Sequence, residues 1–146
     1  MRTPTKVSSR VPEIRPARGI LDTSVIIDLE KIDPLQLPIE VAISAITMAE
    51  LAAGPHATAD ADERSRRQDR LQRAEAAFDP LPFDAEASRA YGRIYATVVA
   101  SGRKARGARA VDLLIAATAC SAGLPLYTRN PADFRSLGDL VEVVGL

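Results

Sequence analysis

Carboxylate side chains are the residues of this chain best suited to carry out chemistry. The sequence contains one histidine, His56, and one cysteine, Cys120. An internal disulfide, a cysteine-based zinc site and a catalytic scheme built on paired histidines are therefore excluded, because each needs more than one such side chain. The candidates that remain are acids beside predicted strands and helices, namely Asp22, Glu50, Asp112 and Asp133.

The positions of these four acids along the chain favour a common site. Asp22 closes the first apolar run, Glu50 follows the second by a few residues, Asp112 lies near the start of an apolar helix, and Asp133 follows a later apolar run. In a parallel sheet flanked by helices, working residues lie at the carboxyl ends of strands and at the helix starts that follow. We therefore expect the four carboxylates to converge at one edge of the sheet.

Asp112 is the most informative of the four. It is the one charge in an otherwise apolar helical segment, where an unpaired carboxylate would cost several kcal/mol. A structural explanation also exists, because the helix dipole favours a carboxylate near a helix start and Arg109 precedes it by three residues. Taken singly, Asp22 can be a helix N-cap, Glu50 part of a solvated helix face and Asp133 a loop acid. The functional interpretation therefore depends on their joint placement.

Short apolar runs and turn residues predict the elements that would position these acids. Strands are expected at 19–21, 39–43, 124–127 and 140–144, and helices begin near residues 22, 44, 58, 84 and 110. The segment 81–83 can make a brief strand, which Pro80 and Pro82 place at an edge or in an irregular position. The helix at 58–78 is charged and should be exposed, whereas the helix at 110–122 is apolar and should be buried. Short strands that alternate with helices predict an α/β fold, with a parallel sheet covered by helices on both faces.

Length and composition indicate one compact domain. The 146 residues are 47% hydrophobic and 26% charged, as in globular proteins. No apolar run predicts a membrane span or a signal peptide, so we expect a cytoplasmic protein with no membrane partner. Residues 1–18 carry five basic residues against one acid and three prolines, and we interpret them as a flexible basic extension. The domain itself is expected at 19–146.

The four acids belong to four short sequence blocks. These are Leu-Asp-Thr-Ser-Val-Ile-Ile-Asp at 21–28, Ile-Ser at 43–44 with Ala-Glu-Leu at 49–51, Asp-Leu-Leu-Ile-Ala-Ala at 112–117, and Thr-Arg-Asn-Pro-Ala-Asp-Phe at 128–134. In this order and spacing the blocks resemble the PIN-domain nucleases and, within them, the VapC-type ribonuclease toxins of bacterial toxin–antitoxin pairs. The resemblance runs from about residue 19 to the C-terminus. It implies a PIN-like three-layer fold and a metal-dependent endoribonuclease.

The resemblance also implies roles for single residues. The family's acidic quartet falls on Asp22, Glu50, Asp112 and Asp133. Polar support would come from Thr128 and Asn130. By hypothesis, Asp22 and Asp112 are the principal metal ligands, while Glu50 acts through a bound water or helps to deprotonate the nucleophile. Asp133 would complete the site or hold a second metal.

The chemistry of the acids agrees with these implied roles. Crowded carboxylates repel one another, and a divalent cation favours their ionised form. An all-oxygen site suits Mg²⁺ or Mn²⁺ better than zinc. The resemblance implies that water attacks the RNA and leaves 5′-phosphate and 3′-hydroxyl ends.

An acidic pocket repels RNA, so cations must hold the RNA backbone near it. The candidate phosphate contacts are Arg103, Lys104, Arg106, Arg109 and Arg129, with Arg135 as a further candidate. A solvated loop is the alternative explanation for these cations. A second group of arginines within 58–78 is interleaved with acids, and there an exposed helix is favoured over an RNA surface.

The resemblance further implies a VapB-type antitoxin as partner and a homodimer. Two other functions stay open at this stage. One is a catalytically inactive PIN-like module that binds RNA or regulates, and the other is a Mg-dependent phosphotransfer domain. The second is disfavoured, because Ser24 stands where a phosphatase requires a second aspartate and no lysine follows Lys104. The sequence does not specify which RNA would be cleaved.

Overall fold

A parallel sheet forms the centre of the protein. The computed structural model describes residues 15–146, whose four strands lie in the order β2-β1-β3-β4. They are β1 (Arg18–Leu21), β2 (Glu40–Ala42), β3 (Leu126–Thr128) and β4 (Val143–Gly145), and every pairing is parallel. The central pairing joins Ile20 of β1 to Leu126 of β3. The predicted short parallel sheet is confirmed.

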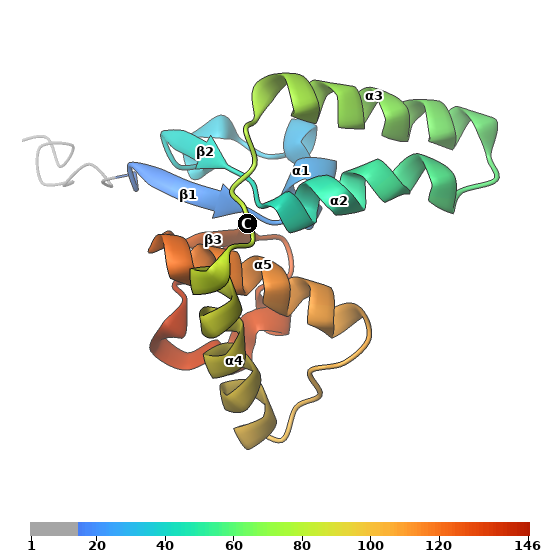
Figure 1. Cartoon of the computed structure of the whole chain (residues 1–146). Helices are drawn as coiled ribbons and strands as arrows, with labels where there is room; N and C mark the ends of the chain where they lie inside the picture. Colours follow the sequence, from blue (N-terminus) through green and yellow to red (C-terminus); the bar gives the residue numbers. More distant parts are fainter. Residues whose placement is uncertain (1–14) are drawn as a thin grey trace, which may run out of the picture.

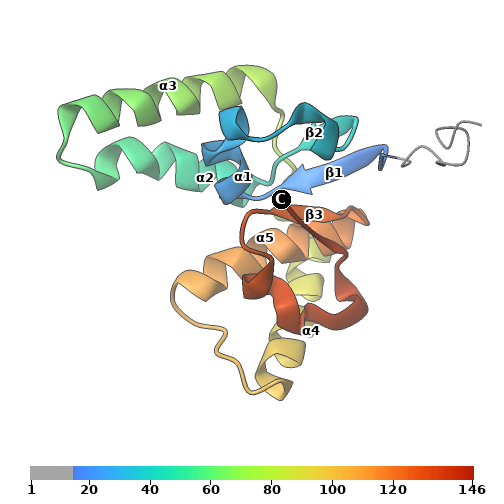
Figure 2. The same cartoon turned by 180° about the vertical axis from the view of Figure 1, so that it is seen from behind.

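Helices cover both faces of this sheet (Figures 1 and 2). They are α1 (Thr23–Ile27), α2 (Ala45–Ala53), α3 (Ala61–Ala77), α4 (Ala85–Ala100) and α5 (Ala108–Ala122). Short 3₁₀ segments lie at Leu29–Lys31, Pro34–Gln36, Gly54–Ala57 and Pro131–Leu140. In Figure 1, α1, α2 and α3 lie above the sheet and α4 and α5 below it. None of the helices in the described part of the chain has the length and apolarity needed to cross a lipid bilayer.

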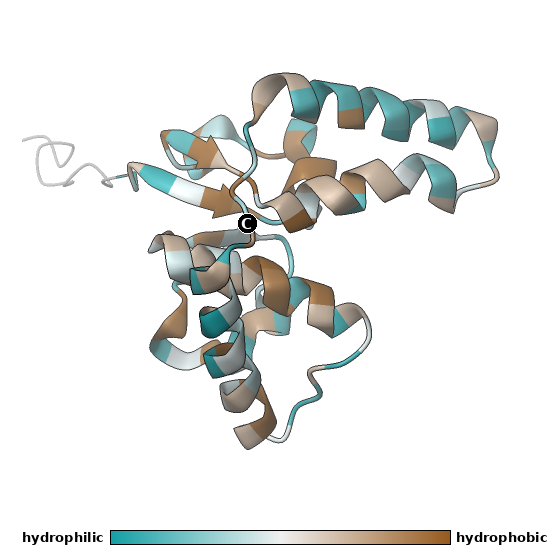
Figure 3. Ribbon diagram, in the orientation of Figure 1, coloured by the Kyte–Doolittle hydropathy of each residue, from teal (hydrophilic) through white to brown (hydrophobic). Residues whose placement is uncertain are grey.

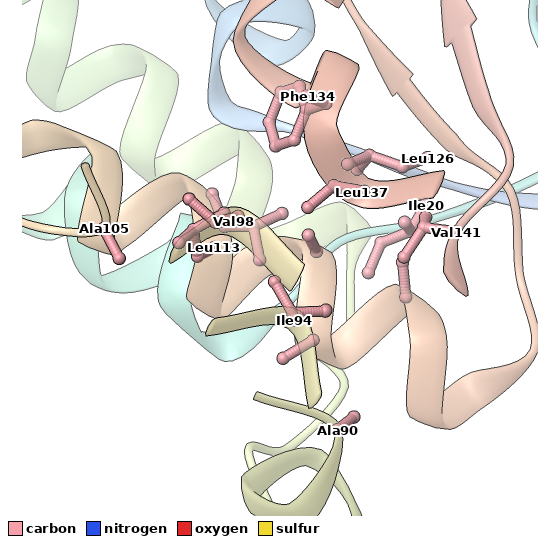
Figure 4. Packing of buried hydrophobic residues seen from close by; sticks show 14 residues of the cluster. Ile20, Ala90, Ile94, Val98, Ala105, Leu113, Leu126, Phe134, Leu137 and Val141 are labelled. Carbon is pink, nitrogen blue, oxygen red and sulfur yellow. The ribbon is translucent and has the colours of Figure 1, made fainter. Parts of the chain in front are cut away.

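Successive strand residues feed two separate cores, because side chains alternate between the faces of a strand. Ile20 and Leu126 pack into the cluster formed with α4 and α5. Their chain neighbours, Leu21 and Tyr127, pack into the cluster formed with α1, α2 and α3. Figure 4 shows the first cluster, in which Val98 of α4 lies beside residues of α5. The sheet is therefore the middle of three layers, as expected.

Side-chain caps explain where the helices begin. Each of four helices starts after a polar side chain that accepts a hydrogen bond from an amide of its first turn. The capping residues are Asp22 for α1, Ser44 for α2, Asp60 for α3 and Asp84 for α4. Gly123 ends α5 with a φ of 66°, in the left-handed region that glycine adopts most readily. These caps hold the starts of α1 and α2 at the carboxyl edge of the sheet.

The two helices singled out by composition behave as predicted. Of the residues of α3, only Leu71 and Ala74 are buried, and Figure 3 shows hydrophilic colours along most of this helix. In α5 the buried residues include Leu113 and the run from Ile115 to Ala119. An exposed, charged helix therefore projects on one side of the sheet, and an apolar helix fills the core on the other.

One expected strand does not form. The segment 81–83 makes a single bridge, in which the Leu81 amide donates to Ile43 O at 2.9 Å and the Ala45 amide donates to Leu81 O at 2.8 Å. The residues on either side of Leu81 are Pro80 and Pro82, which have no amide hydrogen with which to extend a ladder. The brief strand expected at 81–83 is therefore reduced to one bridge, in the irregular position that the two prolines indicate.

The residues just before β1 are attached to the domain. The Arg15 guanidinium donates to Leu37 O at 2.9 Å, the Ile39 amide donates to Pro16 O, and the Glu40 amide donates to Ala17 O. Residues 15–17 therefore contact the domain, upstream of the boundary expected at residue 19. The rest of the expected basic extension, 1–14, lies outside the described residues.

Candidate active site

Asp22 lies at the carboxyl end of the central strand β1. Its amide donates to Tyr127 O at 3.0 Å, which ties it to β3. Its side chain is 4% exposed and accepts hydrogen bonds from Ser24 Oγ at 2.5 Å and the Val25 amide at 3.2 Å. Both hydrogen bonds go to Oδ1. Oδ2 accepts no hydrogen bond from the described residues. The carboxylate is thus fixed in place with one oxygen available to a ligand.

Glu50 lies on α2 and is held by a chain of hydroxyl groups. Thr23 Oγ1 donates to Glu50 Oε1 at 2.5 Å and lies 3.1 Å from Thr47 Oγ1. Thr47 Oγ1 lies 3.3 Å from Ser44 Oγ, and both of these residues are fully buried. Since Thr23 has one hydroxyl hydrogen and gives it to Glu50, Thr47 must donate to Thr23. The hydrogen bonds therefore run from the buried start of α2 towards the carboxylate.

Asp133 reaches the cluster from the 3₁₀ segment after β3. Arg109, in the first turn of α5, donates to Asp133 O at 2.6 Å and lies 3.9 Å from Asp133 Oδ1. Asp112 follows Arg109 by three residues in α5 and is partly buried. One arginine therefore holds the backbone of Asp133 close to the helical turn that carries Asp112.

The four carboxylates interact electrostatically through Asp112. The pKa of Asp112 is raised to about 6, first by burial of the carboxyl group and then by the negative charges of Asp133, Asp22 and Glu50. The positive charge of Arg109 opposes this rise. The four acids predicted to converge are thus close enough for three of them to disfavour ionisation of the fourth.

The donor set is suited to a hard divalent cation. It consists of carboxylate oxygens without histidine or cysteine, and a cation placed among them would offset the repulsion that raises the pKa of Asp112. Within residues 15–146, no three acidic, histidine or cysteine side chains lie close enough together to form a metal-binding group. Binding of an ion would therefore have to draw the carboxylates inward.

The two polar residues expected to support the site lie at the end of β3. Thr128 is fully buried, and its Oγ1 accepts a hydrogen bond from the Asn130 amide at 3.0 Å. This bond shapes the turn that leads to Asp133. Asn130 itself is exposed and contributes its backbone to the contact.

Three of the five expected phosphate contacts are used within the protein. Arg103 donates to Ala132 O at 3.1 Å, Arg109 holds Asp133, and Arg129 pairs with Asp28 at 3.3 Å. Lys104 and Arg106 are exposed and make no ion pair with residues 15–146. The first three cations therefore have structural roles, whereas the last two remain available to a ligand.

Sequence reasoning missed the hydroxyl groups that orient the acids. Thr23 and Ser24 directly follow Asp22, and Thr47 precedes Glu50 by three residues, which is about one helical turn. A hydroxyl residue one turn from a candidate acid was the signal that could have identified Thr47. Its burial and its contact with Thr23 depend on the packing of α1 against α2, which no local pattern contains.

Comparisons with known proteins give a consistent family. Residues 19–140 match the family described as PIN domain. Ribonuclease VapC5 of Mycobacterium tuberculosis is 38% identical over 131 residues, which cover 88% of this chain and 93% of that protein. VapC ribonuclease Y4jK of Sinorhizobium fredii is 35% identical over 82% of this chain and 91% of its own. The crystal structure of VapBC-5, a toxin–antitoxin system of M. tuberculosis, matches with a TM-score of 0.79, 38% identity and coverage of 90% of this chain and 100% of that one.

Proposed function

The chain belongs to the PIN-domain family, and from this premise we propose that it is an endoribonuclease of the VapC kind that hydrolyses RNA phosphodiester bonds. The observation that carries the proposal is that Asp133, Asp22 and Glu50, which lie in three other parts of the chain, all raise the pKa of Asp112. The ribonuclease names of relatives that align over most of both chains support the same activity. The reaction would take place at this cluster of carboxylates.

Nucleases of this family generally use divalent metal ions, and the carboxylate oxygens fit Mg²⁺ or Mn²⁺. In the proposal Asp22, through Oδ2, and Asp112 hold the ion, while Asp133 completes the site. When bound, the ion would supply a polarised water and neutralise charge that develops on the phosphate. Ionised Asp112 is needed to hold it, so ion binding and proton release from Asp112 would be linked.

Glu50 would accept the proton of the attacking water. The hydrogen bond from Thr23 goes to Oε1, which would keep this carboxylate oriented and leave Oε2 to accept the proton. Attack by water on the phosphorus would leave a 5′-phosphate and a 3′-hydroxyl. Thr128 and Asn130 would support the site by fixing the turn before Asp133.

The relatives also support a partner for this chain. The VapBC-5 structure is that of a member of a toxin–antitoxin family, and we propose that a VapB-type antitoxin binds this protein and blocks cleavage. We further propose that the protein forms a homodimer and acts in the cytoplasm. Co-expression with a VapB-type antitoxin, followed by sizing of the purified complex, tests both the partner and the stoichiometry.

Cleavage of a mixed RNA pool by the purified protein tests the activity. We expect cleavage with Mg²⁺ or Mn²⁺ that stops in EDTA, leaves 5′-phosphates and falls by at least about a hundredfold in Asp22→Asn and Asp112→Asn. Asp139→Asn changes the net charge equally at an exposed position and should cleave as the wild type does. Cleavage that persists in EDTA or in both site variants would rule out the proposed mechanism. RNA binding without cleavage would favour the inactive module instead.

A further inference from the structure

A groove leads away from Thr23 and Glu50 along the inner side of α3. A cavity of about 280 Å³ is lined by Thr23 and Glu50 together with Arg67 and Arg70. A second cavity of about 390 Å³ is lined by residues of α1 and α3 and by Phe78. The two cavities share Ile27 and Arg70 as lining residues. Arg70 therefore lies between the cavity that contains Glu50 and the one that continues along α3.

Arg70 differs from the arginines around it in having no partner within the described part of the chain. Arg66 and Arg67 both pair with Glu63, and Arg73 pairs with Asp69 and Glu30. By contrast, no carboxylate of residues 15–146 lies within ion-pair distance of Arg70, which is partly buried. The carboxylate that shares its cavity and lies nearest the reacting centre, Glu50, is occupied by Thr23.

We propose that Arg70 binds a phosphate of the RNA strand adjacent to the phosphate being cleaved, an inference that rests on the function proposed above. The carboxylate cluster repels the RNA backbone, so a cation close to Glu50 is needed to hold the strand across the site. Of the cations expected to do this from the sequence, Arg103, Arg109 and Arg129 are engaged within the protein, while Lys104 and Arg106 remain available on the loop before α5. Arg70 supplies an available guanidinium, which can bind a phosphate with two parallel hydrogen bonds.

The direction of the groove fits an extended strand. The second cavity is lined by the apolar side chains of Ile27 and Phe78 as well as by Arg70. Its two carboxylates, Glu30 and Asp69, are both paired with Arg73. A nucleobase next to a bound phosphate can pack on such an apolar surface, because every base has an apolar face. The strand would thus leave the carboxylates along α3, past Arg70.

The test compares variants at two positions of α3. KM and kcat are measured for Arg70→Ala, Arg70→Gln, Arg70→Lys and Arg73→Ala. Each change is then combined with Asp22→Asn, which keeps the RNA intact, and the RNA affinity of the double variant is measured at several salt concentrations. We expect Arg70→Ala and Arg70→Gln to raise KM and weaken affinity about tenfold and to reduce the salt slope by about one. Arg70→Lys should recover part of this loss. Arg73→Ala, whose charge is already paired, should stay within about twofold of its parent.

The outcomes separate this proposal from the function on which it rests. If the wild type cleaves RNA and Arg70→Ala matches Arg73→Ala in both KM and salt slope, Arg70 is not a phosphate contact. The same conclusion follows if Arg70→Ala weakens only the binding of a protein partner to the groove. If the wild type neither binds nor cleaves RNA, the proposed function itself fails and the role of Arg70 falls with it. Thermal unfolding of each variant checks that folding is intact.

Discussion

Ser24 and Arg129 lie 105 residues apart in the chain, yet the Arg129 amide donates a hydrogen bond of 3.1 Å to Ser24 Oγ. The same hydroxyl donates to Asp22 Oδ1. One small side chain therefore joins the end of β3 to the carboxylate at the end of β1. The position of Asp22 depends on a contact that exists only after both strands have paired.

Replacing Ser24 should impair the site more than the fold. Ser24→Ala removes both bonds, and we expect kcat to fall about tenfold while the free energy of unfolding falls by about 1 kcal/mol. Ser121→Ala is a matched control, because its hydroxyl bonds to Thr118 O near the end of α5, away from the acids. Equal kcat values for the two variants would show that Ser24 does not position Asp22. Initial rates and chemical denaturation measure the two effects.

Thr47 offers a test of the hydroxyl chain that holds Glu50. Thr47→Val keeps the shape of the buried side chain but removes the donor to Thr23, so kcat should fall about tenfold with little change in KM. Thr47→Ser restores the hydroxyl and should recover most of the rate. A Thr47→Ser variant as slow as Thr47→Val would mean that the methyl packing, and not the hydrogen bond, matters at this position.

Because the pKa of Asp112 is raised, removing the charge of this residue should increase the free energy of unfolding by an amount that depends on pH. The folded protein binds this proton more tightly than the unfolded chain, so the contribution of Asp112 is present below about pH 4 and is lost as pH rises through about 6. In metal-free buffer, Asp112→Asn should therefore match the wild type at pH 4 and exceed its free energy of unfolding by about 1–2 kcal/mol at pH 7.5.

Denaturant unfolding at the two pH values measures this difference. Asp139→Asn, at an exposed position, controls for the change in net charge. A gain of the same size in Asp139→Asn, or an Asp112→Asn gain that is constant with pH, would contradict the proposed cause. Addition of Mn²⁺ should narrow the gap, because the ion stabilises only the protein that retains the Asp112 carboxylate.

Two glycine replacements should act in opposite directions. A Cβ on Gly19 would lie 2.5 Å from Tyr127 Cε1 and 2.9 Å from Pro38 Cγ, so Gly19→Ala forces β1 away from its neighbours and should cost about 1–3 kcal/mol. Gly92, inside α4, has open space where a Cβ would be placed. There Ala should stabilise the helix by about 0.5–1 kcal/mol. Thermal unfolding of both variants checks the pair, and a stable Gly19→Ala protein would contradict the close packing.

Local patterns were sufficient for most of the architecture. Apolar runs located the strands β1 to β4, and the capping residues Asp22, Ser44 and Asp84 located the starts of three helices, because both signals depend on neighbours in sequence. The irregular structure at 81–83 has a local cause as well. Its apolar residues gave a strand pattern, but the flanking prolines limit the ladder to one bridge.

The candidate site was predicted less completely than the fold. The four acids could be chosen because parallel strands share a carboxyl edge. The partners of Arg103 and Arg129, however, are Ala132 O and the Asp28 carboxylate, which lie far from these arginines in sequence. The same is true of Thr47, whose hydroxyl meets Thr23 only when α1 and α2 pack together. Partners of this kind are set by tertiary contacts, so the sequence named the cations without showing which of them remain available.

The strand order has a consequence for the time at which this protein can act. β1 is synthesised before its central partner β3, so the pairing of Ile20 with Leu126 must wait until all the residues between them have been made. Contacts of such large sequence separation form late in folding. Asp22 can therefore lie near Asp112 and Asp133 only after β3 and the segment that follows it have left the ribosome. A nascent chain shorter than this lacks the complete set of candidate acids, and a partner present at that moment would meet the domain as the candidate site first forms.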